Sequence, residues 1–277
     1  MEFKQKDTYT IEDLLSIMTL LRSPGGCPWD REQTHQSIRK NFLEETYEVL
    51  EAIDTKDDAL LKEELGDVLL QVVFHARMAE EREAFSFDDV ANDICQKLIV
   101  RHPHIFGEVK ADTAEQVLSN WDDIKLKTKG MEGQSQSMQS VPDILPALMR
   151  SEKVQKKAAK VGYDWNSVYG VLDKLDEEIQ ELKQAIEEEN TEGCHQELGD
   201  VLFTAVNVSR FLEVDAEEAL TRSTNTFIKR FTVAEQLAKE QGIPLPNSDY
   251  ALLDKLWEEA KEAIAQSNQT EFIDESR

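Results

Sequence analysis

The sequence predicts an all-α protein built from two related helical-hairpin domains, and three observations carry this prediction. Apolar residues recur at steps of three and four along most of the 277 residues, which is the period of an amphipathic helix. Helix-capping pairs precede several of these stretches. The sequence contains no run of alternating β-branched residues between turn dipeptides that would indicate a strand hairpin.

The first predicted helix begins after Thr10, which stands three residues before Asp13 as in a capping box. Apolar residues then follow at helical spacing until the segment SPGG, residues 23–26, ends the helix. The same capping spacing predicts two later helix starts, at Ser86 with Asp89 and at Asp215 with Glu218.

The composition changes between residues 127 and 146, where the helical pattern is interrupted. This segment reads KTKGMEGQSQSMQSVPDILP, so glycines, prolines and a Gln/Ser tract replace the periodic apolar residues. It predicts a first domain over residues 1–128, a linker over residues 129–146 and a second domain over residues 147–277.

The two halves share a repeat at a constant offset of 133 residues. LEETYEVL and KEELGDVLLQVV in the first half match DEEIQELK and HQELGDVLFTAV in the second. A repeat of this length indicates an internal duplication. A two-helix hairpin cannot bury both of its apolar stripes alone, so we expect four-helix-bundle packing on another hairpin, in the chain or across a dimer.

Each half carries four carboxylates that the hairpin geometry brings together. In the second half, Glu181 and Glu197 stand eight residues from a turn centred near residue 189, and Glu178 and Asp200 stand eleven residues from it. Each pair therefore lies at one height, and the two acidic residues of each helix share a face. The first half repeats the arrangement about residue 56 with Glu45, Glu48, Glu64 and Asp67.

Four clustered carboxylates repel one another unless cations lie among them, and an all-oxygen site suits Mg²⁺, with Mn²⁺ as a substitute. Such ions bind phosphate oxygens and activate water, so hydrolysis of a phosphoanhydride is the natural chemistry. A single Glu-x-x-Glu in an acidic chain is more simply a solvated helix face. The matched heights, present in both halves, favour a metal site.

Lys174 lies four residues before Glu178 on the same helical face. It either reaches a phosphate held by the metal or forms an ordinary surface ion pair, and the sequence leaves both open. Asn41 stands at the corresponding place in the first half. The second half is therefore the better equipped of the two.

Several segments together resemble the MazG family of nucleoside triphosphate pyrophosphohydrolases. They are the two EExxE blocks with ELGD sixteen residues on, and CPWDREQTH, RHPHIFG, NWDDIK, LPALMR and KKAAKVGYDW in this order. The resemblance covers nearly the whole chain. It implies magnesium-dependent conversion of nucleoside triphosphates to monophosphates and pyrophosphate, in an all-α homodimer whose helices pair across subunits.

The resemblance also assigns residues. It places the family's catalytic metal ligands on Glu178, Glu181, Glu197 and Asp200. It places a phosphate-binding lysine on Lys174, an arginine on Arg230 and a nucleotide-contacting tryptophan on Trp257. The family has a basic residue where this chain has Thr226, and Lys229 is the neighbour placed to compensate. Most of the catalysis is expected in the second half.

The overall charge limits the partners of the protein. Acidic residues outnumber basic ones by 56 to 31, and such a surface repels nucleic acid and anionic membranes. The three cysteines are odd in number and widely spaced, as expected for reduced thiols. The first residues contain no signal-like apolar core, and no stretch is long enough to span a membrane. We therefore expect a cytoplasmic protein.

Two other classes of protein compete with this interpretation. A ferritin-like diiron protein needs Glu-x-x-His on two helices, whereas Glu64 and Glu197 are followed three residues later by Asp67 and Asp200. The second class is a non-enzymatic helical scaffold that binds a partner through its apolar stripes. Absence of magnesium-dependent hydrolysis would favour the scaffold.

Overall fold

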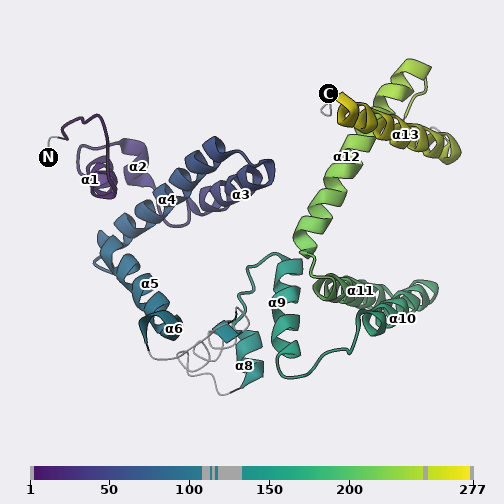
Figure 1. The fold of residues 1–277 in the computed structure, drawn as a ribbon, viewed down its shortest axis with the longest axis horizontal. Helices are drawn as coiled ribbons and strands as arrows, with labels where there is room; N and C mark the ends of the chain where they lie inside the picture. Colours follow the sequence, from purple (N-terminus) through teal and green to yellow (C-terminus); the bar gives the residue numbers. More distant parts are fainter. Residues whose placement is uncertain (1–2, 108–112, 114–115, 118–132, 246–248, 275–277) are drawn as a thin grey trace. The chain divides into compact units, whose positions relative to one another are not determined.

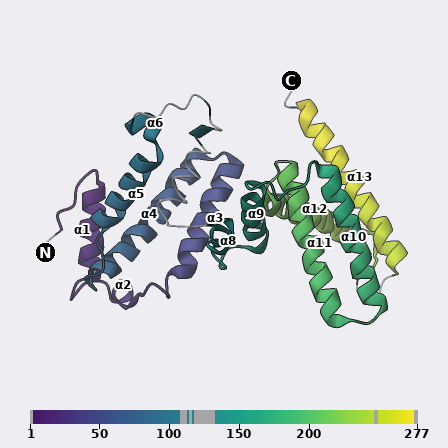
Figure 2. The same ribbon diagram turned by 90° about the horizontal axis from the view of Figure 1, so that it is seen from below.

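The computed structural model describes residues 3–107, 113, 116–117, 133–245 and 249–274. These residues form helices and contain no strand, so the all-α prediction is confirmed for the described part of the chain. The chain divides into two compact units, residues 1–128 and 129–277. Figures 1 and 2 show the helices of each unit from two directions.

Unit 1 is organised around a hairpin of two long helices. Its helices are α1 (Ile11–Arg22), α2 (Pro28–Glu32), α3 (Arg39–Thr55), α4 (Asp58–Glu80), α5 (Phe87–Arg101) and α6 (Pro103–Phe106). Helices α3 and α4 pack side by side, and α1 and α5 also contact α4. The two capping boxes predicted for this half are present, at Thr10 with Asp13 and at Ser86 with Asp89.

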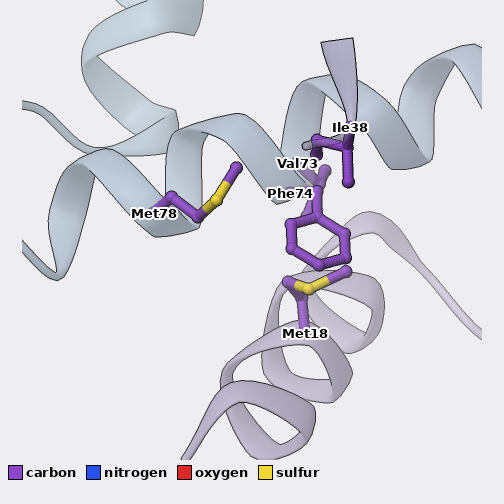
Figure 3. Packing of buried hydrophobic residues seen from close by; sticks show 5 residues of the cluster. All are labelled: Met18, Ile38, Val73, Phe74 and Met78. Atoms are coloured by element: carbon purple, nitrogen blue, oxygen red, sulfur yellow. The ribbon is translucent and has the colours of Figure 1, made fainter. Parts of the chain in front are cut away.

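The core of unit 1 joins α1, α4 and the residue that precedes α3. Met18, Ile38, Val73, Phe74 and Met78 form the buried cluster (Figure 3). Each of these side chains is at most 5 % exposed, so each contributes about 1.5–3 kcal/mol of hydrophobic stabilisation. This cluster fixes the middle and the C-terminal half of α4.

Unit 2 contains a second hairpin and a pair of longer helices. Its helices are α8 (Gln134–Gln139), α9 (Ala147–Ala159), α10 (Val168–Glu187), α11 (Thr191–Phe211), α12 (Ala216–Gln241) and α13 (Tyr250–Asp274). Helix α10 packs along α11, α13 packs along α12, and α9 contacts both α11 and α12. Helix α8 falls within the segment that the sequence predicts as a linker.

Both hairpins turn where their sequences predict. Lys56 and Glu189 adopt left-handed backbone conformations with φ of 56° and 53°, which end α3 and reverse the chain after α10. The Asp57 side chain then accepts hydrogen bonds from the N–H groups of Ala59 and Leu60 to start α4. Asn190 does the same for Gly193 at the start of α11. These caps satisfy N–H groups that have no partner inside the helix.

Within the described residues, no helix combines the length and the apolar character needed to cross a membrane.

Candidate metal centre

The second hairpin brings three of its predicted carboxylates into one cluster. Glu178 on α10 and Glu197 and Asp200 on α11 each offer a carboxylate oxygen, and these oxygens lie within 4.8 Å of one another. Glu178 is only 6 % exposed, while Glu197 and Asp200 are half-buried. The antiparallel packing of α10 on α11 places them at the same height, as the spacing from the turn predicts.

Glu181, one turn after Glu178, belongs to the same electrostatic group. Partial burial raises the pKa of Glu181, and its hydrogen bond with Glu178 and the charges of Glu178 and Glu197 raise it further. Glu181 is more exposed to solvent than the other three. Three of the four predicted carboxylates therefore converge, and Glu181 lies beside them on the solvent-exposed side.

Lys174 lies at the edge of this cluster. Its Nζ atom is 2.9 Å from Oε1 of Glu178 and 2.7 Å from Oε1 of Glu177. Hydrogen bonds to these two carboxylates raise the pKa of Lys174, so the ammonium stays charged. The sequence placed Lys174 and Glu178 on one helical face, and the structure joins them in an ion pair.

The first hairpin also brings three carboxylates together, but not the three that correspond to those of the second. Oxygens of Glu45 and Glu48 on α3 and Glu64 on α4 lie within 4.8 Å of one another, and Asp67, the counterpart of Asp200, is not in this group. Burial raises the pKa of both Glu45 and Glu64. The charge of Asp67 on Glu45, and that of Glu48 on Glu64, raise these pKa values further. Asn41, which is exposed, stands where the second hairpin has its lysine.

The donor chemistry of both clusters fits a hard divalent cation. All the donors are carboxylate oxygens, which Mg²⁺ and Mn²⁺ prefer over the nitrogen and sulfur ligands of zinc sites. Burial raises the pKa values of Glu45, Glu64 and Glu181, and repulsion from the neighbouring carboxylates raises them further. A cation would reverse that repulsion. Glu178, Glu197 and Asp200 would hold it in unit 2, and Glu45, Glu48 and Glu64 in unit 1.

The other predicted binding residues lie on the α12 and α13 pair. Lys229 and Arg230 are on α12. The ring of Trp257 on α13 contacts the ring of Phe227 in a tilted arrangement, with ring centroids 5.1 Å apart. In the part of the chain that the structure describes, no hydrogen bond or ion pair joins Lys229 or Arg230 to the carboxylates. The hydroxyl of Thr226 donates to the Arg222 carbonyl oxygen at 2.8 Å.

Phe227 was not singled out from the sequence, although it is the ring that contacts Trp257. Phe227 and Phe231 stand one turn apart on α12 with centroids 6.2 Å apart, and Phe227 is 57 % exposed. The segment FIKRF contained the signal, because two aromatic residues at a spacing of four share a helix face. The segment NWDDIK of the first half lies outside the described residues.

Comparison with known proteins identifies the family. The family model described as "MazG nucleotide pyrophosphohydrolase domain" matches residues 33–106 and 167–232, which contain the two hairpins and both carboxylate clusters. The chain is 46 % identical over 250 residues to "Nucleoside triphosphate pyrophosphohydrolase/pyrophosphatase MazG" of Thermotoga maritima, covering 90 % of this chain and 95 % of that protein.

Two further relatives extend this comparison. "Nucleoside triphosphate pyrophosphohydrolase" of Escherichia coli K12 is 41 % identical over 256 residues, 91 % of this chain and 97 % of the relative. "Uncharacterized protein YabN" of Bacillus subtilis is 47 % identical over 253 residues, 91 % of this chain but 52 % of the relative. With a family model over both hairpins and two relatives aligned over at least 95 % of their lengths, the chain belongs to the MazG nucleotide pyrophosphohydrolase family.

Proposed function

We propose that the protein hydrolyses nucleoside triphosphates to nucleoside monophosphates and pyrophosphate, with Mg²⁺ or Mn²⁺ held by the carboxylate cluster of α10 and α11. The observation that carries the proposal is the convergence of Glu178, Glu197 and Asp200 within 4.8 Å. Relatives named nucleoside triphosphate pyrophosphohydrolases support the choice of substrate and cleavage position.

Each residue of the cluster has a role that follows from its position. A bound divalent cation supplies Lewis acidity to phosphate oxygens and to an attacking water. Glu178, Glu197 and Asp200 hold the cation. Glu181 lies on the solvent side, and its raised pKa suits a group that accepts a proton from water.

Lys174 and the α12–α13 pair bind the substrate in this proposal. When the cation shares the charge of Glu178, the Lys174 ammonium is free to interact with a phosphate oxygen. Lys229 and Arg230 supply further positive charge near the phosphates. Lys229 compensates for the basic residue that the family has at the position of Thr226. The ring of Trp257 contacts the nucleotide.

The second hairpin does most of the catalysis in this proposal. Both hairpins carry a carboxylate cluster, but Lys174 has Asn41 as its counterpart. Without a lysine at this place, the first cluster lacks a positive charge to hold a phosphate beside the cation.

The active protein is a homodimer in this proposal. Leu43, Tyr47 and Leu65 on the first hairpin, and Leu198 and Leu202 on the second, are each at least half exposed. Large apolar side chains in rows on helices are the pattern that an opposing hairpin covers. A second copy of the chain supplies two such hairpins.

The partners and the compartment follow from charge and thiols. A net charge of -25 opposes binding to nucleic acid or to anionic membranes. Cys27, Cys95 and Cys194 are free, as is usual in a reducing compartment. We therefore place the protein in the cytoplasm, acting on free nucleotides.

Product analysis tests the activity. The purified protein is incubated with several nucleoside triphosphates, with magnesium and with chelator. Monophosphate and pyrophosphate formed only with metal is the expected result. Diphosphate and orthophosphate would contradict the cleavage position, and absence of turnover with every triphosphate would favour a binding scaffold.

A further inference from the structure

Two histidines far apart in the sequence meet at one end of the first hairpin. His35 lies between α2 and α3, and His75 lies on α4. Their Nδ1 atoms are 2.7 Å apart, and their ring planes are within 5° of parallel. The ring of Phe42, on the first turn of α3, lies 5.9 Å from His75. The pair therefore ties the segment before α3 to α4.

Arg82 determines which nitrogen of each ring carries a proton. Its Nη2 atom is 3.0 Å from Nε2 of His35. A guanidinium has only donors and does not lose its proton, so Nε2 of His35 accepts. Neutral His35 then carries its proton on Nδ1 and donates to Nδ1 of His75. The bonds run in one direction, from Arg82 through His35 to His75.

We propose that Arg82, His35 and His75 form an acid-sensitive latch that holds residues 33–38 against α4. The latch is closed when His75 is neutral. A proton added to Nδ1 of His75 faces the Nδ1–H of His35, which the bond from Arg82 keeps in place. This addition sets two donors against each other, which costs the hydrogen bond that joins the segment to α4 and adds repulsion from the positive charge of Arg82.

The surrounding charges do not offset this repulsion. In the described residues, no carboxylate forms an ion pair with either histidine. The other charged side chains at this end of α1, α3 and α4 pair with one another: Arg22 and Arg77 with Glu81, Arg77 also with Glu80, and Lys40 with Glu44. Arg39 is exposed to solvent. Arg82 is the charged side chain that is hydrogen-bonded to the histidine pair.

Burial of His75 also favours its neutral form. Desolvation, followed by the charge of His35, lowers the pKa of His75 from its ordinary value. The folded state thus binds its proton less readily than the unfolded state. The contribution of the latch is complete above about pH 6.5, the usual value for histidine, and is lost as the pH falls towards the lowered pKa.

Opening the latch loosens a segment without unfolding the unit. Ile38, three residues after His35, is 3 % exposed and lies in the cluster with Val73 and Phe74 (Figure 3). This apolar anchor does not titrate. The Arg22 side chain also donates to the Gln33 carbonyl oxygen at 3.2 Å, and this bond does not titrate either. Acid therefore releases the attachment at His35, and the residues around it move while the core persists.

Hydrogen–deuterium exchange of the full chain at pH 7.5 and pH 5.5 measures this directly. After correction for the intrinsic pH dependence of exchange, protection of residues 33–38 is expected to fall about tenfold, because the attachment loses one hydrogen bond. Peptides from α10 and α11 in the same sample serve as the internal control. Equal corrected protection of residues 33–38 at the two pH values would overturn the proposal.

Two variants separate the latch from simple packing. In His75→Phe the ring stays but the acceptor is lost, so protection is low at both pH values. In Arg82→Gln the amide oxygen can accept from an Nε2–H of neutral His35. Nδ1 of His35 can then accept a hydrogen bond from protonated His75, so protection at pH 5.5 is retained. Arg82 is exposed, and this variant decides the matter even if His75→Phe does not fold. The same acid loosening in Arg82→Gln as in the natural chain would exclude the mechanism.

Discussion

At the residue scale, the two carboxylate clusters differ in their nearest positive charge. Glu178 is buried and forms an ion pair with Lys174. In the first cluster, Glu45 and Glu64 have raised pKa values and no lysine on the face where Lys174 stands. The carboxylates of the two hairpins thus have different electrostatic surroundings. We therefore expect substitutions in the two hairpins to lower turnover by different amounts.

Glu178→Gln or Asp200→Asn is expected to lower turnover at least about 100-fold, because each removes a charged cation ligand. The matched substitutions Glu45→Gln and Asp67→Asn should change turnover only a few-fold. Steady-state rates at saturating magnesium measure both sets, with circular dichroism as the check on folding. Equal losses from the two sets would refute the asymmetry between the hairpins.

Lys174→Met keeps the length of the side chain and removes its charge. We expect kcat/KM to fall by about tenfold to 100-fold, because a charge-assisted contact to phosphate is lost. Lys40→Met is the matched control, since Lys40 forms an exposed ion pair with Glu44 at the same spacing of four residues, 2.8 Å long. A loss of the same size in both variants would indicate a general effect of surface charge.

At the element scale, the hairpins are the part of the molecule that local sequence determines. The apolar period, the acidic spacing and the turn centres near residues 56 and 189 predict α3 with α4 and α10 with α11, and the left-handed residues Lys56 and Glu189 lie at those centres. The convergence of Glu178 with Glu197 and Asp200 follows from the same spacing.

Other features depend on contacts between distant segments and could not be predicted. His35 and His75 are 40 residues apart, and no local period relates them. The contact of Trp257 with Phe227 depends on how α13 packs along α12. The position of Lys229 and Arg230 relative to the carboxylates depends on the packing of α12 beyond its own sequence. The spacing of residues along the sequence predicts which face of a helix they occupy. It does not predict how that helix packs against another.

The first hairpin should be stabilised by removing one of its own charges. Burial raises the pKa of Glu45 and Glu64, and neighbouring carboxylates, including Glu48, raise it further. The stability that these two groups contribute is therefore complete below about pH 4.5 and is lost as the pH rises through their raised pKa values. In chelator at pH 7.5, Glu48→Gln is therefore expected to raise the melting temperature of unit 1. With magnesium the order should reverse, because the variant lacks a ligand. Differential scanning calorimetry in both buffers measures this. A variant that melts lower in chelator would show that the charges are already neutralised.

At the scale of the whole molecule, the proposed homodimer makes a prediction about mass. Sedimentation equilibrium is expected to give about twice the chain mass of 31.7 kDa, since a lone hairpin leaves one face uncovered. Leu202→Lys, on α11 and 52 % exposed, should shift the protein towards a single chain because a buried lysine at an interface has no partner.

Ile144→Lys provides the matched control for this prediction. Ile144 is 74 % exposed and lies outside the two hairpins, so the same change there should leave the mass unaltered. A single-chain mass for the natural protein would contradict the homodimer. Dissociation by both variants alike would instead attribute the effect to added charge.

The left-handed residues at the two turns make each hairpin independent of the other half for its reversal. Lys56 and Glu189 are not glycines, yet each reverses the chain inside its own half, and each following helix is capped by its own neighbour, Asp57 or Asn190. Each half therefore carries the residues that turn and cap its own hairpin. A substitution at one turn is expected to leave the other hairpin paired.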